Sequence, residues 1–196
     1  MRTLITKARA LSYLEIPKVK HDLPQDTQRR IASKSLALKK TTAVIRKQIN
    51  IGQGTIPLIT SNTQEETGVS TFEGDRLPDR KNIVFNAVAL GYGTHATDSD
   101  KAAVINYDAS LIPSLRNAEL EIKSDGKVVA TVQCSEFSND LAAASGRDLY
   151  FDLGGEYMIR EGKKFEINLK FPEGATGGGT VDYVEVRLDA IATSEN

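Results

Sequence analysis

The sequence contains one cysteine, two histidines and no tryptophan among its 196 residues. The single cysteine, Cys134, excludes an internal disulfide and fits a protein made in a reducing cytoplasm. One cysteine and two histidines cannot supply the four nitrogen or sulfur ligands that a structural zinc site needs. Neither His21 nor His95 lies in a recognisable Ser-His-Asp or Cys-His context. We therefore predict that the protein is not an enzyme and has no catalytic residues, no metal ligands and no cofactor.

Long apolar runs are also missing. No uninterrupted stretch approaches the roughly 20 residues that a membrane-spanning helix requires. The first ten residues are basic, and Lys7 and Arg9 interrupt what would be the apolar core of a signal peptide. We expect a chain that neither spans a membrane nor is exported by a standard signal.

Charge is abundant but unevenly distributed. The whole chain has a formal charge of −1. Residues 1–50 hold twelve Lys and Arg against three acids, a charge of +9, and the remaining residues hold 13 basic and 23 acidic groups, a charge of −10. Such asymmetry indicates a segment that meets polyanions, joined to a body with another role.

The basic segment supplies the candidate site residues. Three interpretations remain open. Its cations solvate a mobile arm or pair with the acidic body of the same or a neighbouring subunit, they contact a polyanion such as nucleic acid, or they lie on an anionic membrane with Leu4, Leu11 and Leu14 inserted. The candidate residues for polyanion contact and assembly are Arg2, Lys7, Arg9, Lys18, Lys20, Arg29, Arg30, Lys34, Lys39, Lys40, Arg46 and Lys47.

Local patterns within residues 1–50 predict one or two short helices. Residues 3–14 place apolar side chains near one face, and Pro24 opens a second helical stretch that extends to about Leu38. Residues 16–21 should run extended because Pro17 disfavours a helical residue before it. Residues 41–49 are rich in β-branched side chains and suit a strand.

Residues 51–71, rich in Gly, Thr, Ser and Asn, are expected to be a linker or an extended segment that follows the surface.

The remaining residues, 72–196, read as short strands separated by turns. Residues 82–91 are apolar on both faces, which is typical of a central strand. Residues 118–123 alternate, and Asp125-Gly126 before the next alternating run is a strong hairpin signal. Residues 165–171 and 181–192 alternate in the same way, with Asp182, Glu185, Arg187 and Asp189 expected to be mostly solvated. We predict an all-β fold, an antiparallel β-sandwich or jelly roll, with a basic N-terminal arm.

This organisation resembles that of viral coat proteins, particularly bacteriophage capsid proteins with a jelly-roll body. The resemblance rests on the basic arm 1–50, the linker 51–71 and the β body 72–196. It implies a structural, self-assembling protein of the virion, made in the host cytoplasm. Its partners would be other copies in the shell, further virion proteins, and viral nucleic acid or an internal anionic membrane at residues 1–50.

An alternative function is a non-enzymatic β-sandwich that binds a ligand or glycan, such as a phage fibre or adhesion head. Loops 92–101 and 172–180 would then carry recognition. They contain few aromatic residues, chiefly Tyr92, which counts against a sugar-stacking platform.

Overall fold

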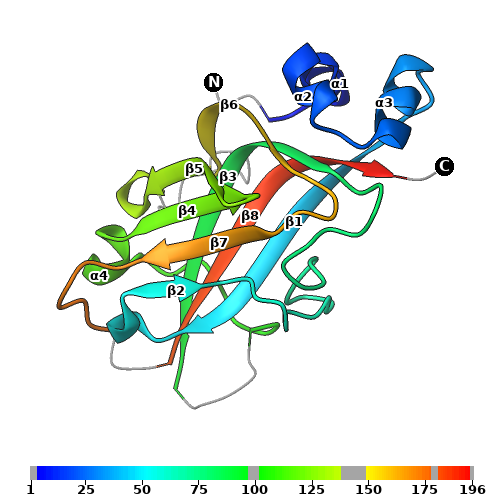
Figure 1. Ribbon diagram of the computed structural model, residues 1–196. Helices are drawn as coiled ribbons and strands as arrows, with labels where there is room; N and C mark the ends of the chain where they lie inside the picture. The colour runs from blue at the N-terminus through cyan, green and yellow to red at the C-terminus, as the bar shows by residue number, and fades with distance from the viewer. Residues whose placement is uncertain (1–3, 97–101, 138–148, 178–180, 195–196) are drawn as a thin grey trace.

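The computed structural model describes residues 4–96, 102–137, 149–177 and 181–194 (Figure 1). Its helices are α1 (Lys7–Glu15), α2 (Pro17–His21), α3 (Gln25–Ala32) and α4 (Pro113–Arg116), with 3-10 turns η1 (Ile51–Gln53) and η2 (Cys134–Glu136). Its strands are β1 (Ala37–Ile49), β2 (Thr55–Pro57), β3 (Ile83–His95), β4 (Glu119–Ser124), β5 (Lys127–Gln133), β6 (Phe151–Ile159), β7 (Phe165–Lys170) and β8 (Val181–Ser194).

The eight strands form two antiparallel four-stranded sheets. Sheet A has the order β1-β8-β3-β6, and sheet B has the order β2-β7-β4-β5. Strands that follow one another in the chain therefore alternate between the sheets, except at the β4–β5 hairpin, and the first and last strands are neighbours. This is the two-sheet strand order of a jelly roll. The predicted all-β sandwich is confirmed.

One main core fills the space between the sheets. The inward residues of β8 are Val184, Val186, Leu188 and Ala190, each at most 1% exposed. The facing strands of sheet B contribute Phe165, Ile167 and Leu169 from β7 and Leu120 and Ile122 from β4. Since side chains on a strand alternate between faces, these positions are the apolar members of the alternating pattern in the sequence.

Strand β1 corrects the predicted boundary of the basic arm. All 13 of its residues pair with β8, from Ala37 opposite Ser194 to Ile49 opposite Asp182. Ala43, Ile45 and Ile49 are at most 5% exposed and belong to the main core. Residues 37–49 are therefore part of the sandwich, because their alternate side chains complete its interior.

The helical predictions are confirmed in type and corrected in extent. α1 begins at Lys7 because the Thr6 side chain caps it, accepting a hydrogen bond from the Arg9 N–H. Residues 17–21, expected to be extended, form helix α2. Pro17 occupies the first helical position, where a backbone N–H would have no partner within the helix, so the missing N–H of proline costs nothing. α3 ends at Ala32, and Lys34 has a φ of 57°, so the chain turns into β1 before Leu38.

The segment 51–71, predicted as a linker or an extended segment that follows the surface, runs along the sandwich surface. Its residues 55–57 are β2, which pairs with β7 at the edge of sheet B. Its residues 69–71 lie against the free edge of β1: the Arg46 N–H donates to the Val69 carbonyl at 2.8 Å, and the Thr71 N–H donates to the Val44 carbonyl at 3.0 Å. The segment is therefore built into both sheets.

Candidate assembly and polyanion surface

Helices α1 to α3 form a layer on the outer face of sheet A, at one end of the sandwich (Figure 1). Their buried apolar residues are Ala10, Leu14 and Ile31, joined by Leu23 between α2 and α3, each at most 3% exposed. They form a second cluster with Val84, Met158 and Ile191 of sheet A. The apolar stripe of the helices is thus used to bind the sheet, which leaves their polar faces outward.

A hydrogen-bonded contact anchors the start of this layer to the sheet. The Ile5 N–H donates to Asp189 Oδ2 at 2.7 Å, and Asp189 is 3% exposed. Lys40 Nζ pairs with Asp189 Oδ1 and also donates to the Ile5 carbonyl at 3.1 Å. Asp189 and Lys40 therefore hold the backbone of Ile5 from both sides.

The structure divides the twelve predicted cations into two groups, and Arg2 lies outside the described residues. The first group is neutralised or hydrogen-bonded within the chain: Arg9 to Glu156 (2.7 Å), Arg30 to Asp26 (3.2 Å), Lys40 to Asp189, Arg46 to Glu185 (2.6 Å), and Lys47 to the Pro57 carbonyl (2.8 Å). Burial lowers the pKa of Lys47. Three of these pairs join the basic segment to the acidic body of the same chain.

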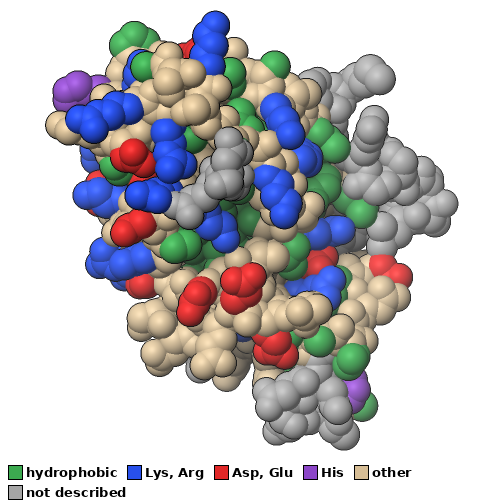
Figure 2. Space-filling model, turned by 90° about the vertical axis from the view of Figure 1, so that its right-hand side faces the viewer, with side chains coloured by type: hydrophobic (Ala, Val, Ile, Leu, Met, Phe, Trp, Pro, Cys, Tyr) green, Lys and Arg blue, Asp and Glu red, His purple; other side chains and the backbone are tan. Residues whose placement is uncertain are grey.

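The second group has no ion-pair partner among the described residues. It consists of Lys7, Lys18, Lys20, Arg29, Lys34 and Lys39. The first five of these, which we call the basic layer, lie on the helices or directly after α3. Figure 2 shows Lys and Arg side chains over the upper half of this view with some acidic side chains among them, and further acidic side chains lower down.

The acids of the same segment do little to offset the basic layer. Asp22 lies 3.6 Å from Arg160, and Asp26 pairs with both Arg30 and Arg80. Glu15 is the remaining acid of residues 1–50 and is exposed. Five cations therefore face solvent against one unneutralised carboxylate in the described part of this segment.

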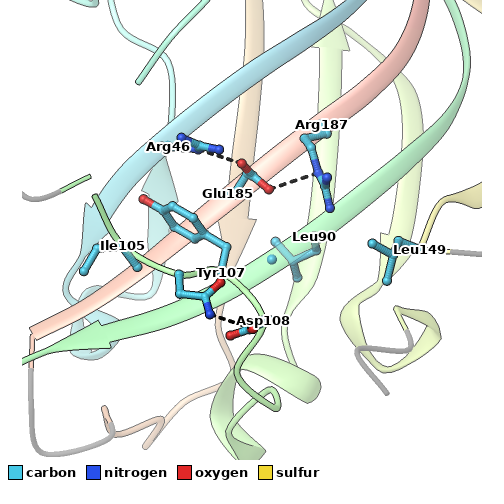
Figure 3. A pocket seen from close by; sticks show the side chains of 10 residues that line it. Arg46, Leu90, Ile105, Tyr107, Asp108, Leu149, Glu185 and Arg187 are labelled. Carbon is cyan, nitrogen blue, oxygen red and sulfur yellow. Dashed lines mark hydrogen bonds and ion pairs between the residues drawn. The ribbon is translucent and has the colours of Figure 1, made fainter. Parts of the chain in front are cut away.

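A second polar site lies further along the outer face of sheet A (Figure 3). Glu185, 3% exposed, accepts from Arg46 at 2.6 Å and lies 3.0 Å from Arg187 Nε through its other oxygen. The Arg46 guanidinium stacks on the Tyr107 ring at 5.1 Å. These groups line a hollow of about 270 Å³ together with Leu90, Asn106, Asp108 and Leu149.

This cluster corrects the prediction that the polar residues of β8 are mostly solvated. Glu185 and Asp189 are each 3% exposed, because the loop 105–108 and the helices cover the outer face of sheet A. Asp182, 5% exposed, has the same strand phase as the inward residues Val184 and Val186 and lies beside Tyr92 of the main core. Asp182 accepts from the Tyr92 hydroxyl, and burial is the main cause that raises the pKa of Tyr92. The alternation placed Glu185, Arg187 and Asp189 on the outer face correctly, but it did not reveal the loop and helices that cover this face, and it misplaced Asp182.

Two glycines of β3 permit this covering. A Cβ atom on Gly93 would lie 2.4 Å from the Asn106 carbonyl oxygen, and one on Gly91 would lie 2.9 Å from Tyr107 Cβ. The loop can therefore rest directly on the strand only because both positions lack a side chain. The sequence Gly91-Tyr-Gly93 was the available signal for this close approach.

The cysteine and the two histidines lie on three different elements of the fold. Cys134 is fully buried, and burial, followed by the charge of Glu119, raises the pKa of its thiol to about 12. His21 lies at the end of α2 and His95 at the end of β3, on different elements. Among the described residues there is no group of three or more His, Cys, Asp or Glu that could hold a metal ion. None of the described helices is long and apolar enough to cross a membrane.

No protein-family model matches the chain, and no curated protein matches it. Among solved structures, the chain is similar to the acidic stable capsid structure of Helicobacter pylori bacteriophage KHP30, at 8% sequence identity and a TM-score of 0.34. The match covers 82% of this chain and 94% of that chain.

Proposed function

We propose that this protein is a structural, self-assembling protein: a coat subunit of a bacteriophage-type capsid whose basic layer faces a polyanion such as the genome. Jelly rolls serve as viral coat subunits, as lectins and as cupins. Because a fold alone does not define a function, the choice among these depends on the surface of this chain.

The observation that carries the proposal is the basic layer on a jelly-roll body. Its five cations, Lys7, Lys18, Lys20, Arg29 and Lys34, belong to a folded layer fixed to sheet A by a buried apolar cluster. A fixed set of cations on one end of a subunit gives every copy in a shell the same orientation toward an enclosed polyanion. Cations without carboxylate partners neutralise phosphates without reading a sequence of bases.

The packing of the layer favours nucleic acid over a membrane surface. Binding in a membrane interface requires apolar side chains that enter the lipid. Leu14 is 0% exposed, and Leu4 packs beside Ala87 and Ala89. Leu11 is half-buried, and Ile16, between α1 and α2, is the large hydrophobic residue exposed in the described part of the layer, at 45%. The layer thus offers phosphate-binding charge with little apolar surface for lipid.

Two measurements on the full-length protein test this function. Electron microscopy and sedimentation velocity should show closed particles that form above a threshold protein concentration. A protein that stays monomeric at every concentration and salt tested would overturn the shell function.

Binding to a fluorescent double-stranded DNA fragment, followed over a range of salt concentrations, tests the polyanion contact. The double substitution Lys18→Gln/Lys20→Gln should reduce the slope of log K against log salt by about 2, since each lost phosphate contact changes it by about 0.9. The matched control, Lys127→Gln/Lys164→Gln, removes two exposed cations, one at the start of β5 and one directly before β7, where Lys164 pairs with Glu166. If both pairs change the slope equally, the basic layer is not the contact surface, and the shell function is judged by particle formation alone.

A further inference from the structure

The edges of the two sheets differ in how they are protected against an added strand. The middle of β1 is covered by residues 69–71, and β2 has only three residues, the last of them Pro57. In β6, residues 153–156 bulge out opposite the single residue Asn86 of β3, and this bulge carries Glu156. Short strands, proline, bulges, charges and covering segments are the usual means by which proteins prevent edge pairing.

The fourth edge, β5, has few of these protections. It lies at the end of sheet B farthest from β2 and pairs with β4 alone (Figure 1). Its last six residues, Val128–Gln133, include no charge, proline or glycine. The register with β4 shifts once, at Val129, and is regular over residues 130–133. Val128 is a large hydrophobic residue at 53% exposure. This edge is therefore a template for a further strand.

The backbone of β5 offers hydrogen-bonding groups on its open side. The Cys134 N–H donates to the Ala118 carbonyl at 2.9 Å, toward β4. Because backbone groups of an antiparallel strand point alternately to its two sides, Val132 also faces β4, whereas Thr131 and Gln133 direct their N–H and C=O groups outward. Among the described residues, no backbone hydrogen bond reaches these two from the open side.

A second copy of β5 fits this edge in antiparallel pairing about a twofold axis at Thr131. The two Thr131 residues then exchange N–H to C=O hydrogen bonds, and Gln133 of each copy lies opposite Val129 of the other. The Thr131 side chain is exposed and lies opposite Glu121, on the face of sheet B that points away from the core. Two threonines placed across from each other on one face stabilise a strand pair.

The charges beside β5 are complementary in this arrangement. The Lys127 residues of the two copies lie at opposite ends of the ladder, about 27 Å apart, since eight residues separate them along the strands. Each comes across from residue 135 of the other copy, next to Glu136. Lys127 and Glu136 are both exposed, and neither has an ion-pair partner in the described part of the chain. Self-pairing of β5 thus brings Lys127 to Glu136 twice and places no like charges across the ladder.

We propose that two copies of this chain pair through their β5 edges about a twofold axis at Thr131, so that sheet B continues from one subunit into the next. This inference rests on the proposed self-assembly and specifies one of its contacts. A twofold contact uses the same surface of both copies and closes on itself as a dimer. A shell built from such dimers uses further contacts elsewhere on the subunit.

Cysteine cross-linking of the full-length protein tests the position of the twofold axis. In Thr131→Cys, the two new thiols lie across one hydrogen-bonded pair, with Cα atoms about 5.5 Å apart, a separation that a disulfide can bridge. In the matched control, Gln133→Cys, the two cysteines are four residues apart along the ladder, about 14 Å. The native Cys134 is buried in both variants.

Under a mild thiol oxidant, Thr131→Cys should form a covalent dimer on a non-reducing gel, and Gln133→Cys should not. Equal cross-linking in the two variants, or none in either, would overturn the pairing.

Charge reversal tests the same contact by sedimentation velocity. Glu136→Lys places a cation beside Lys127 of the other copy and should weaken self-association by about tenfold or more, because like charges then face each other. The double variant Lys127→Glu/Glu136→Lys restores opposite charges and should associate as the parent does. Lys127→Gln alone removes an exposed ion pair, which contributes little, and should change association by at most about threefold.

Unchanged association in Glu136→Lys, or weak association that the double variant does not restore, would overturn the β5 contact. Particles formed by these variants would leave the shell function intact. A parent protein that forms no oligomer would overturn both proposals.

Discussion

At the scale of single residues, the absence of a side chain decides how the loop 105–108 packs. Gly91 and Gly93 face this loop, and Gly93 has the tighter contact, with an added Cβ 2.5 Å from Ile105 Cγ2. The same loop carries Tyr107, whose ring stacks against Arg46. The position of the Arg46–Glu185–Arg187 cluster therefore depends on two glycines of a neighbouring strand.

The substitution Gly93→Ala should reduce the free energy of unfolding by about 2 kcal/mol, because overpacking at a tight contact forces the loop away from the strand. Chemical denaturation measures the loss. Gly155→Ala is the matched control, since an added Cβ there meets nothing within 4 Å. Equal stability in the two variants would show that the loop does not depend on close contact with β3.

At the scale of elements, the helical layer is attached to sheet A by one apolar cluster and by the contact of Asp189 with Ile5. Replacing Asp189 by Asn removes the charge that holds Lys40 and weakens the acceptor for the Ile5 N–H. Hydrogen bonds to charged groups contribute about 1.5–3 kcal/mol, and the partial exposure of Lys40 places this one at the lower end.

We expect Asp189→Asn to increase amide hydrogen exchange in α1 about tenfold, while exchange in β3 stays slow. Hydrogen exchange read by mass spectrometry separates these peptides. Asp79→Asn is the control, because Asp79 is an exposed carboxylate. Uniformly faster exchange across all strands would mean that Asp189 supports the whole sandwich and not the attachment of the helices.

At the scale of the whole molecule, the charge of residues 1–50 is divided between two structural parts. The helices carry the basic layer, whereas β1 is a strand of the jelly roll whose cations Lys40 and Arg46 pair with β8. A deletion that treats residues 1–50 as a detachable arm therefore removes both. The boundary between the two parts lies at residues 33–36, between α3 and β1.

The chain 36–196 should retain a cooperative thermal transition and β-sheet circular dichroism at a lower midpoint than the parent. The chain 51–196 should not, because it loses the core residues Ala43, Ile45 and Ile49 and leaves one edge of β8 unpaired. Circular dichroism melts of the two truncations decide the point. A folded 51–196 would show that β1 is dispensable.

The sandwich could be predicted because apolar and polar residues alternate along a strand with one buried face, as in residues 165–171 and 181–192. The sequence also predicted an excess of cations at residues 1–50. It did not predict which of them pair, because Arg46 and Glu185 are 139 residues apart in the chain and meet only through the register of β1 with β8. The prediction of an extended segment at residues 16–21 is wrong, because proline disfavours a helical residue before it but also suits the first position of a helix.

The place of β8 in sheet A has a consequence for the way the protein is made. β8 lies between β1 and β3 and pairs with both over nearly its whole length, yet it spans residues 181–194. During translation, β1 and β3 are synthesised long before the strand that joins them. The pair β3–β6 can form earlier, but sheet A cannot be completed until residue 194 has left the ribosome, so the nascent chain carries unpaired edges of β1 and β3 for most of its synthesis. Pairing over such sequence separations is slow, and a chaperone that shields β1 and β3 during this interval would raise the yield of folded protein.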